Sequence, residues 1–408
     1  ATLAATHTSA GTFVGTIGVM YTAGWSFGWV LLSIPLAYWF VAAVLAPRFT
    51  RVKELTLPAF METRYYGKDI RALAAVIVLV ATVVYVQAQI VAGGLIANLV
   101  FGIPLTTGMV VFTLVLLIYT VAGGMMAVVY TDAFQLVVMS LGAVMAVPMA
   151  LSHLDGGMPF LELVESARPT AFAWGTLPGS LLLTMGLSFF LGGIATPEKL
   201  IRLYAMKDMR AIRRGVFFAI AMILLLNLLV LTLALAAMVF FPRLPTGDLA
   251  MPMIATAVLP TTLGAVMLAA VTAAMMSTVD SLLIVAGSAL SVDLYRNLVN
   301  PDATPRAQRW VDRLGVLVVG TIPVLLLLAG VGEGELIQFI VLLFTALMAA
   351  AFAPTVIGGV LWRRATKEGA AAAMIGGVAA TFAWEAWGSA AIEPALPGVL
   401  VSLALFVG

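Results

Sequence analysis

The feature that most constrains this chain is the succession of continuous apolar runs along its 408 residues. Each run is about 20 residues long, the length that an α-helix needs to cross the hydrocarbon core of a bilayer. Charged residues make up only 10% of the chain, against roughly 25% in soluble domains. Because the runs are continuous rather than alternating, a transmembrane barrel is excluded. The sequence therefore predicts an all-α polytopic membrane protein.

We expect twelve spans, at residues 1–22, 27–46, 72–100, 104–122, 126–151, 178–201, 213–241, 262–292, 310–330, 335–361, 369–390 and 394–408. Lys and Arg concentrate on the cytoplasmic side of membrane proteins. Nineteen of the 21 basic residues follow even-numbered spans or flank them, so these segments are predicted to be cytoplasmic. They are Arg48, Arg51, Lys53, Arg64, Lys68, Arg71, Lys199, Arg202, Lys207, Arg210, Arg213, Arg214, Arg296, Arg306, Arg309, Arg313, Arg363, Arg364 and Lys367. We expect a multi-pass protein of the cell inner (plasma) membrane.

Two of the predicted spans carry residues that interrupt helices. The first is rich in Thr, Ser and Gly between Thr6 and Gly18, and the sixth contains Gly192, Gly193 and Pro197. Interrupted helices at corresponding positions of two halves indicate an inverted-repeat transporter with its site near the membrane midplane. The alternative is that the glycines only allow close helix packing.

The eighth predicted span contains a polar cluster inside an apolar run. Ser277, Thr278, Asp280 and Ser281 lie within about one and a half helical turns. An ionisable group in hydrocarbon costs on the order of 2.5–3.5 kcal/mol, so it normally faces a partner or an ion path. Hydroxyl and carboxylate oxygens are ligands of hard cations, so the cluster predicts a cation site.

We expect this site to bind Na⁺ between the first and eighth spans. If the first helix unwinds near Ser9–Gly11, it exposes backbone carbonyls opposite the hydroxyls of the eighth. Five oxygens suit Na⁺ better than a proton, which needs only one titratable group. The predicted oxygens come from Ala5, Thr8, Ala274, Ser277 and Thr278. The alternative for the two hydroxyls is hydrogen bonding to the preceding turn of their own helix.

Several motifs occur in order along nearly the whole chain. They are Thr56–Phe60 with Arg64 and Tyr65, Gly123–Gln135, Pro197 to Arg202, and Met276–Ser281 with Ser291–Tyr295. In these motifs the chain resembles the sodium/solute symporter family, which includes proline, pantothenate and sialic acid transporters. The resemblance implies the leucine-transporter-type fold, with two inverted five-helix repeats plus extra C-terminal helices. The ten-helix transport core would cover residues 1–361, as repeats 1–151 and 178–361, followed by additional helices at 369–408.

The resemblance also implies sodium-driven uptake by alternating access, through the same five-oxygen site. Asp132 matches a family aspartate near the ion path, and with Asp280 and Ser281 it would form a second sodium site. Family members with that second site tend to carry a hydroxyl where this chain has Asp280. The number of ions and the choice between sodium and proton therefore stay open. Asp132 also has a plainer interpretation, as a helix cap at the cytoplasmic interface.

The predicted substrate contacts are His7, Ser9, Thr12, Gln87 and Phe189. The three in the first span match positions that hold the substrate carboxylate in sialic acid transporters, although a lone His in a helix is more often structural. Gln87 and Gln89 are spaced so that only one faces the cavity. We expect a small carboxylate-bearing solute (pantothenate, a monocarboxylate or an amino acid) held without a fixed cation, since basic residues fall only near cytoplasmic ends.

Other classes of function have little support. The chain has no cysteine, its histidines are His7 and His153, and no nucleophile–base pair appears, so we expect no enzyme. The sequence has no stripe of basic residues of the kind that binds nucleic acid. The expected partners are a small-molecule substrate, the sodium ion and the bilayer. The alternatives are a proton-coupled transporter, or a sensor module of a signalling protein whose other part lies beyond a trimmed terminus.

Overall fold

The computed structural model describes residues 2–48, 56–154, 157–204, 206, 208–332 and 334–408, with the side chains of 124–127, 129, 201, 203 and 204 also left out. Throughout these ranges the regular structure is helical and no strand occurs. The basic residues Arg51, Lys53 and Lys207, which we predicted to be cytoplasmic, lie outside the described residues.

The first part of the chain forms α1 (Thr2–His7), η1 (Gly11–Gly15), α2 (Thr16–Ala23), η2 (Trp25–Leu32), α3 (Ser33–Phe40), η3 (Val41–Leu45), α5 (Leu57–Tyr65), α6 (Lys68–Phe101), α7 (Leu105–Ser152), α8 (Phe160–Ala167) and η4 (Trp174–Thr176). The second part forms α9 (Gly179–Ala195), α10 (Pro197–Tyr204), α11 (Met209–Phe240), η5 (Gly247–Leu249), α12 (Ala250–Met253), η6 (Ile254–Val258), α13 (Thr261–Ser288), η7 (Ala289–Val299), α14 (Pro305–Leu328), α15 (Ile337–Leu361), α16 (Lys367–Trp387) and α17 (Ala395–Val407).

Local sequence signals set many of these boundaries. Side-chain oxygens at the N-caps accept hydrogen bonds from backbone N–H groups of the first turn, which would otherwise lack partners. These caps are Thr56 on α5, Asp208 on α11, Thr304 on α14 and Thr366 on α16. At the other end, Gly102 stops α6 with φ of 65°, a left-handed conformation that costs glycine little.

Within the described residues, eight helices are long and apolar enough to cross a membrane. We predicted twelve spans from the sequence. The first and sixth predicted spans are not among the eight, because each is broken into pieces shorter than 18 residues. The fourth and fifth predicted spans run through a single helix, α7, whose two apolar stretches are Leu105–Gly123 and Tyr130–Ser152.

The two predicted helix interruptions are confirmed. α1 ends at His7, and helical structure resumes at Gly11 after a short non-helical link. α9 ends at Ala195 and α10 begins at Pro197, with Thr196 in extended conformation between them. Proline has no backbone N–H and clashes with the preceding turn, so it ends the incoming helix and starts the next.

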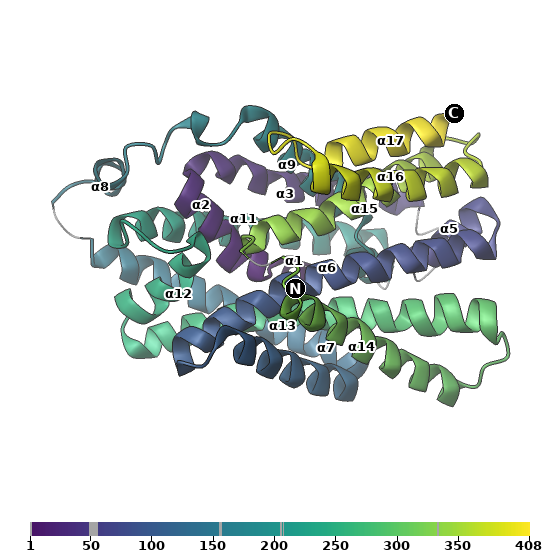
Figure 1. Cartoon of the computed structure of the whole chain (residues 1–408), viewed down its shortest axis with the longest axis horizontal. Helices are drawn as coiled ribbons and strands as arrows, with labels where there is room; N and C mark the ends of the chain where they lie inside the picture. The colour runs from purple at the N-terminus through teal and green to yellow at the C-terminus, as the bar shows by residue number, and fades with distance from the viewer. Residues whose placement is uncertain (1, 49–55, 155–156, 205, 207, 333) are drawn as a thin grey trace.

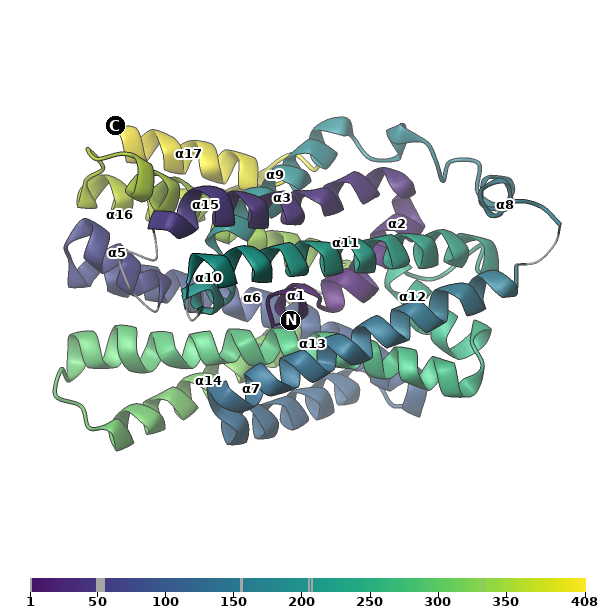
Figure 2. The same ribbon diagram turned by 180° about the vertical axis from the view of Figure 1, so that it is seen from behind.

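The broken helix α1 lies at the centre of the bundle, in contact with α7, α11 and α13 (Figure 2). α13 packs along α7, and α15 packs against α6 and α9. Large apolar side chains are exposed on the outer faces of α7, α11 and α14, as expected for helices that contact lipid. The bundle therefore encloses the polar first span inside apolar walls.

Several segments predicted to be cytoplasmic meet at one end of the molecule, where α5, α16 and the loop before α14 lie (Figure 1). Arg71 of α6 pairs with Glu62 and with Asp293 of η7, each at 2.7 Å. Lys367 at the start of α16 lies 3.0 Å from Asp69. These contacts join the loops after the second, eighth and tenth predicted spans, and the short helix α8 lies toward the opposite end.

Candidate functional site

The interruption in the first span is held open by α6. The Gln89 side-chain oxygen accepts a hydrogen bond from the backbone N–H of Ala10 at 2.9 Å. The Tyr85 hydroxyl donates to Ser9 Oγ at 3.1 Å, and Ser9 Oγ also accepts from the N–H of Gly11. A broken helix leaves backbone groups without partners in a region that has no water. Gln89 of α6 satisfies one of these groups, and Ser9, held by Tyr85 of α6, satisfies a second, so both stabilise the break.

Carbonyl oxygens of the break face two hydroxyls of α13. Ser277 Oγ lies 3.2 Å from the carbonyl oxygen of Ala5 and 3.0 Å from that of Ala274. Thr278 Oγ1 lies 3.3 Å from the carbonyl oxygen of Thr8 and 3.1 Å from that of Ala274. Both hydroxyls are fully buried. The structure therefore brings together all five residues that we predicted to supply the sodium oxygens.

This cluster has more acceptors than donors. Ser277 and Thr278 each have one hydroxyl proton, yet each lies within reach of at least two carbonyl oxygens. The back-bonding alternative is present too, because Ala274 belongs to the preceding turn of α13. The acceptor capacity left over is the kind that a dehydrated hard cation fills, and none of the five ligating groups carries a formal charge. The donor set thus fits Na⁺.

One helical turn further along α13, a charged cluster has a different composition. Arg202 of α10 donates from Nη2 to Asp132 Oδ2 at 2.6 Å and to Ser281 Oγ at 2.6 Å. Asp132 is completely buried and lies in the middle of α7 rather than at a helix start. The helix-cap interpretation of Asp132 is therefore wrong. The guanidinium of Arg202, which we had assigned to the cytoplasm, lies between two of the predicted ligands of a second sodium.

Asp280 adjoins this cluster without joining the ion pair. Its Oδ1 accepts a hydrogen bond from Thr120 at 2.6 Å. Its Oδ2 and the Oδ1 of Asp132 are buried with no hydrogen-bond partner among the described residues. Of these two buried carboxylates only Asp132 pairs with the guanidinium, and each has one oxygen without a hydrogen-bond partner among the described residues.

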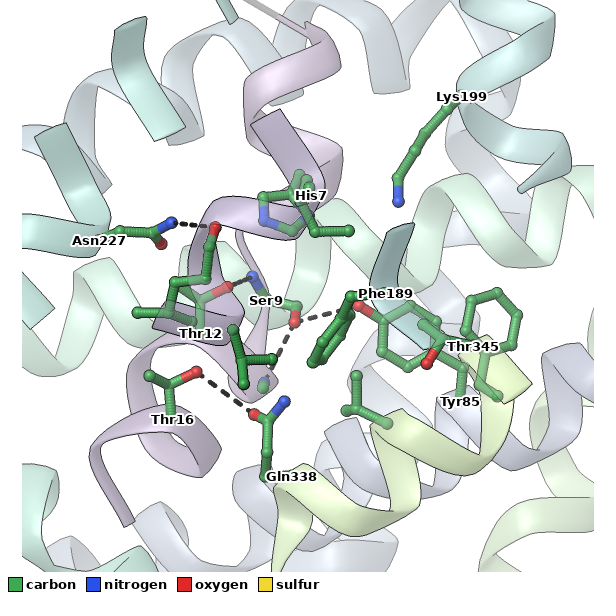
Figure 3. Close-up of a pocket in the computed structure, with 16 residues that line it drawn as sticks. His7, Ser9, Thr12, Thr16, Tyr85, Phe189, Lys199, Asn227, Gln338 and Thr345 are labelled. Carbon is green, nitrogen blue, oxygen red and sulfur yellow. Dashed lines mark hydrogen bonds between the residues drawn. The ribbon is translucent and has the colours of Figure 1, made fainter. Parts of the chain in front are cut away.

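A cavity opens beside the break in the first span (Figure 3). Its polar wall comes from the first span, α10, α11 and α15, and its apolar wall from η2, α3, α9 and α15. The residues that line it are His7, Ser9, Gly11, Thr12, Thr16, Val30, Leu31, Ile34, Tyr85, Phe189, Lys199, Asn227, Gln338, Val341, Phe344 and Thr345. A pocket with one apolar side and a few convergent polar groups suits a small amphipathic solute.

Four of the five predicted substrate contacts line this cavity: His7, Ser9, Thr12 and Phe189. Gln87 does not. It donates to the backbone oxygen of Val331 at 2.6 Å and lines a separate cavity between α6, α14 and α15. Residues two apart on a helix lie about 200° apart around its axis, so only one of the two amides can face inward. The inward one is Gln89, whose side-chain oxygen accepts the hydrogen bond from Ala10 in the break.

Sequence reasoning missed several cavity residues. Asn227 of α11 donates to the carbonyl oxygen of Leu31, and Gln338 of α15 accepts from the hydroxyl of Thr16. Asn227 is an isolated amide in an apolar run, a signal that could have identified it. Lys199 is the larger miss, because its side chain is 7% exposed and lines the cavity. Our expectation that no fixed cation lies near the substrate is therefore wrong.

A carboxylate covers the outer end of the first span. Asp248, in the loop between α11 and α13, accepts a hydrogen bond from the N–H of Ile337 at 2.9 Å, at the start of α15. Its other oxygen has no partner among the described residues, and burial raises the pKa of Asp248 to about 7. A methyl group built on Gly18 would lie 2.5 Å from that oxygen, so the loop rests directly on the backbone of α2.

The chain is similar in sequence to known transporters over nearly its whole length. The model of the sodium:solute symporter family matches residues 1–377. The chain is 29% identical to the sodium/pantothenate symporter of Escherichia coli, over 100% of this chain and 86% of that protein. It is 26% identical to the high-affinity proline transporter of Bacillus subtilis, over 96% of this chain and 84% of that protein.

Two solved structures have the same fold. A Na⁺-coupled sialic acid symporter in a substrate-bound outward-open state superposes with a TM-score of 0.83 at 19% identity, over 99% of this chain and 87% of that one. The nucleobase–cation symporter Mhp1 in a closed conformation gives a TM-score of 0.63 at 13% identity, over 100% and 90%. The leucine-transporter-type fold predicted from the sequence is confirmed, with its two inverted five-helix repeats and extra C-terminal helices.

Proposed function

The chain belongs to the sodium:solute symporter family, and from that premise we propose that it imports a small carboxylate-bearing organic solute together with Na⁺. The observation that carries the proposal is the pairing of the Ser277 and Thr278 hydroxyls with carbonyl oxygens of the broken first span. The adjoining cavity gives a solute site next to the ion site. Relatives named as sodium symporters of pantothenate and proline support the same activity.

The proposed ion site lies where two helices from different repeats meet. The ion would hold α1 against α13, so it would stabilise whichever state keeps these helices together. A ligand shifts a conformational equilibrium only by its differential affinity for the two states. If Na⁺ binds best when the cavity is open to the outside, it raises the affinity for solute there, and solute raises the affinity for Na⁺ equally. Coupling needs no covalent chemistry, so the protein acts as a transporter rather than an enzyme.

A second sodium at Asp132, Asp280 and Ser281 is the weaker part of the proposal. Arg202 already donates to Asp132 and Ser281, so a second cation would have to displace or adjoin the guanidinium. The unpartnered Asp280 oxygen supports the proton-coupled alternative at the same place. We therefore propose one sodium at the carbonyl–hydroxyl cluster as the coupling ion.

The proposal includes a location in the plasma membrane and a division into a transport core. The core is proposed to cover residues 1–361, as repeats 1–151 and 178–361, with the helices at 369–408 outside it. The long apolar helices support a multi-pass membrane protein. The alternative, a sensor module of a signalling protein, predicts solute and sodium binding without net transport.

Sodium dependence tests the function directly. Purified protein is reconstituted in liposomes, and uptake of labelled pantothenate, proline and pyruvate is measured with a Na⁺ gradient, a choline gradient or a proton gradient. We expect accumulation of one or more of these solutes only with Na⁺. Accumulation that follows the proton gradient alone would replace sodium by proton coupling, and binding without accumulation would favour the sensor.

A hydroxyl deletion tests the ion site itself. Thr278→Val keeps the side-chain shape and removes one proposed ligand, so the Na⁺ concentration for half-maximal uptake should rise about tenfold or more, which is about 1.4 kcal/mol. Thr272→Val is the matched control, because the Thr272 hydroxyl on the same helix bonds only to the carbonyl oxygen of Leu268. Equal Na⁺ dependence in both variants would refute the site.

A further inference from the structure

Lys199 is the one fixed cation among the sixteen residues that line the central cavity, and none of those residues is Asp or Glu. It lies in the first turn of α10, directly after the break at Thr196, where its backbone N–H bonds back to the Thr196 carbonyl oxygen. Figure 3 shows its ammonium directed toward the part of the cavity where His7 lies. The interruption of the sixth span therefore turns a cation inward at membrane depth.

The ammonium forms no direct ion pair in the described part of the chain. The ion pairs found there do not include Lys199. Its Nζ lies 5.9 Å from the centroid of the Tyr38 ring. The neighbouring Glu198 is buried and attracts the ammonium electrostatically, but it forms no direct ion pair with it and does not line the cavity. A buried charge without a direct ion pair is costly in a lipid-enclosed interior, so an anion that enters the cavity is favoured by pairing with it.

Resting on the proposed function, we propose that Lys199 determines substrate specificity, and that the substrate is a small monocarboxylate without a cationic group. The carboxylate pairs with the Lys199 ammonium, since charge-assisted hydrogen bonds are about twice as strong as neutral ones. A zwitterionic amino acid is disfavoured, because its ammonium would meet Lys199 and find no carboxylate on the cavity wall. A neutral sugar is disfavoured because it leaves the buried cation unpaired.

The rest of the cavity limits the body of the substrate. Phe189, Phe344 and Ile34 give an apolar surface on one side, and Thr12, Asn227 and Gln338 offer hydroxyl and amide groups on the other. These groups suit a short acid with an apolar stem and one or two polar groups. Both a simple short-chain acid and a hydroxy acid amide such as pantothenate meet this description.

Matched acid and neutral pairs test the proposal on the wild-type protein. In detergent with NaCl present, thermal unfolding is followed against propionate and propionamide, against pantothenate and pantothenol, and against proline. We expect at least one acid to stabilise the protein at a concentration about tenfold or more below its neutral partner, and proline to have no effect. Stabilisation by neither acid, equal stabilisation by acid and neutral partner, or stabilisation by proline alone would overturn the proposal.

Variants at Lys199 assign the discrimination to this residue. Lys199→Met should remove the preference for acid over neutral compound, while Lys199→Arg should keep it. Lys68→Met, at the exposed start of α6, controls for the loss of a positive charge. Should Lys199→Met fail to fold, Lys199→Gln takes its place. A preference that survives in the folded variant refutes the role of Lys199.

The sodium response separates this inference from the proposed function. The same unfolding assay compares NaCl with choline chloride in the absence of solute. Stabilisation by Na⁺ that is unchanged in Lys199→Met, together with a lost acid preference, supports both proposals. Stabilisation by Na⁺ with an unchanged acid preference in Lys199→Met contradicts only the role of Lys199. Absence of any Na⁺ response in the wild type contradicts the proposed function.

Discussion

Two clusters on neighbouring turns of α13 face the first repeat with opposite electrostatics. The cluster around Ser277 and Thr278 consists of neutral carbonyl and hydroxyl oxygens and has acceptors to spare. The cluster around Asp132 contains its own cation, the Arg202 guanidinium, paired at 2.6 Å. We propose that the neutral oxygen cluster takes up a cation from solution, whereas the second cluster already holds a side-chain cation. The comparison teaches that buried oxygens indicate an exchangeable ion only where no side-chain cation already occupies them.

The largest effect is expected when the ion pair of Asp132 and Arg202 is broken. Asp132→Asn leaves the Arg202 guanidinium buried without its carboxylate, which should cost roughly 3–5 kcal/mol of stability. The free energy of unfolding in detergent micelles measures this loss. The double variant Asp132→Asn with Arg202→Gln should recover most of it, since both charges are then gone. If Asp132→Asn unfolds like wild type and transports with the same sodium dependence, the ion pair has no role.

The next largest effect is expected in the neutral cluster of Ser277 and Thr278. Ser277→Ala removes a hydroxyl but no charge, so stability without Na⁺ should change by less than about 1.5 kcal/mol. The Na⁺ concentration that gives half-maximal stabilisation should instead rise about tenfold, because one ligand is lost. Thermal unfolding across a NaCl series measures both quantities. A large loss of stability in choline chloride with no change in the Na⁺ response would show that Ser277 has a structural role and is not an ion ligand.

Asp248 provides a third case, a buried carboxylate outside the predicted membrane spans that forms no ion pair among the described residues. Its raised pKa of about 7 means that the folded protein keeps this proton up to near-neutral pH, while the unfolded chain releases it near pH 4. Stability from this group therefore falls as pH rises, by about 1 kcal/mol between pH 6 and 8. Asp248→Asn should remove that part of the pH dependence of unfolding. An unchanged pH profile would show that Asp248 is ionised in the folded protein.

The smallest effect is expected at Asp280, between the two clusters. Asp280→Asn keeps an oxygen to accept from Thr120 and removes the charge, one oxygen of which has no partner among the described residues. Stability should stay equal or rise by up to about 1 kcal/mol, and the Na⁺ response should not change. The measurement is the NaCl series used for Ser277→Ala. A tenfold weaker Na⁺ response would make Asp280 a ligand and merge the two clusters into one site.

Sequence patterns predicted the helix interruptions and the pairing of Ser277 with Ala5. A polar side chain in an apolar run must face the bundle interior, because hydrocarbon offers it no hydrogen-bond partner. The same patterns misjudged Lys199 and Arg202. A charge count assigns basic residues near the end of a span to the cytoplasm, and it cannot see that the break at Thr196 redirects the next turn inward. The pair Gln87 and Gln89 fails for a related reason, since periodicity shows that the two amides face apart but not which one faces the cavity.

The close contact between Gly18 and Asp248 has a consequence for gating. Any side chain at position 18 would act as a wedge between the outer loop and α2, because the loop oxygen already occupies the space of a Cβ. The hydrogen bond from Ile337 ties that same loop to α15, so a wedge at Gly18 would also loosen the outer end of a helix that lines the cavity. We therefore expect Gly18→Ala to weaken this outer contact and to favour an outward-open conformation.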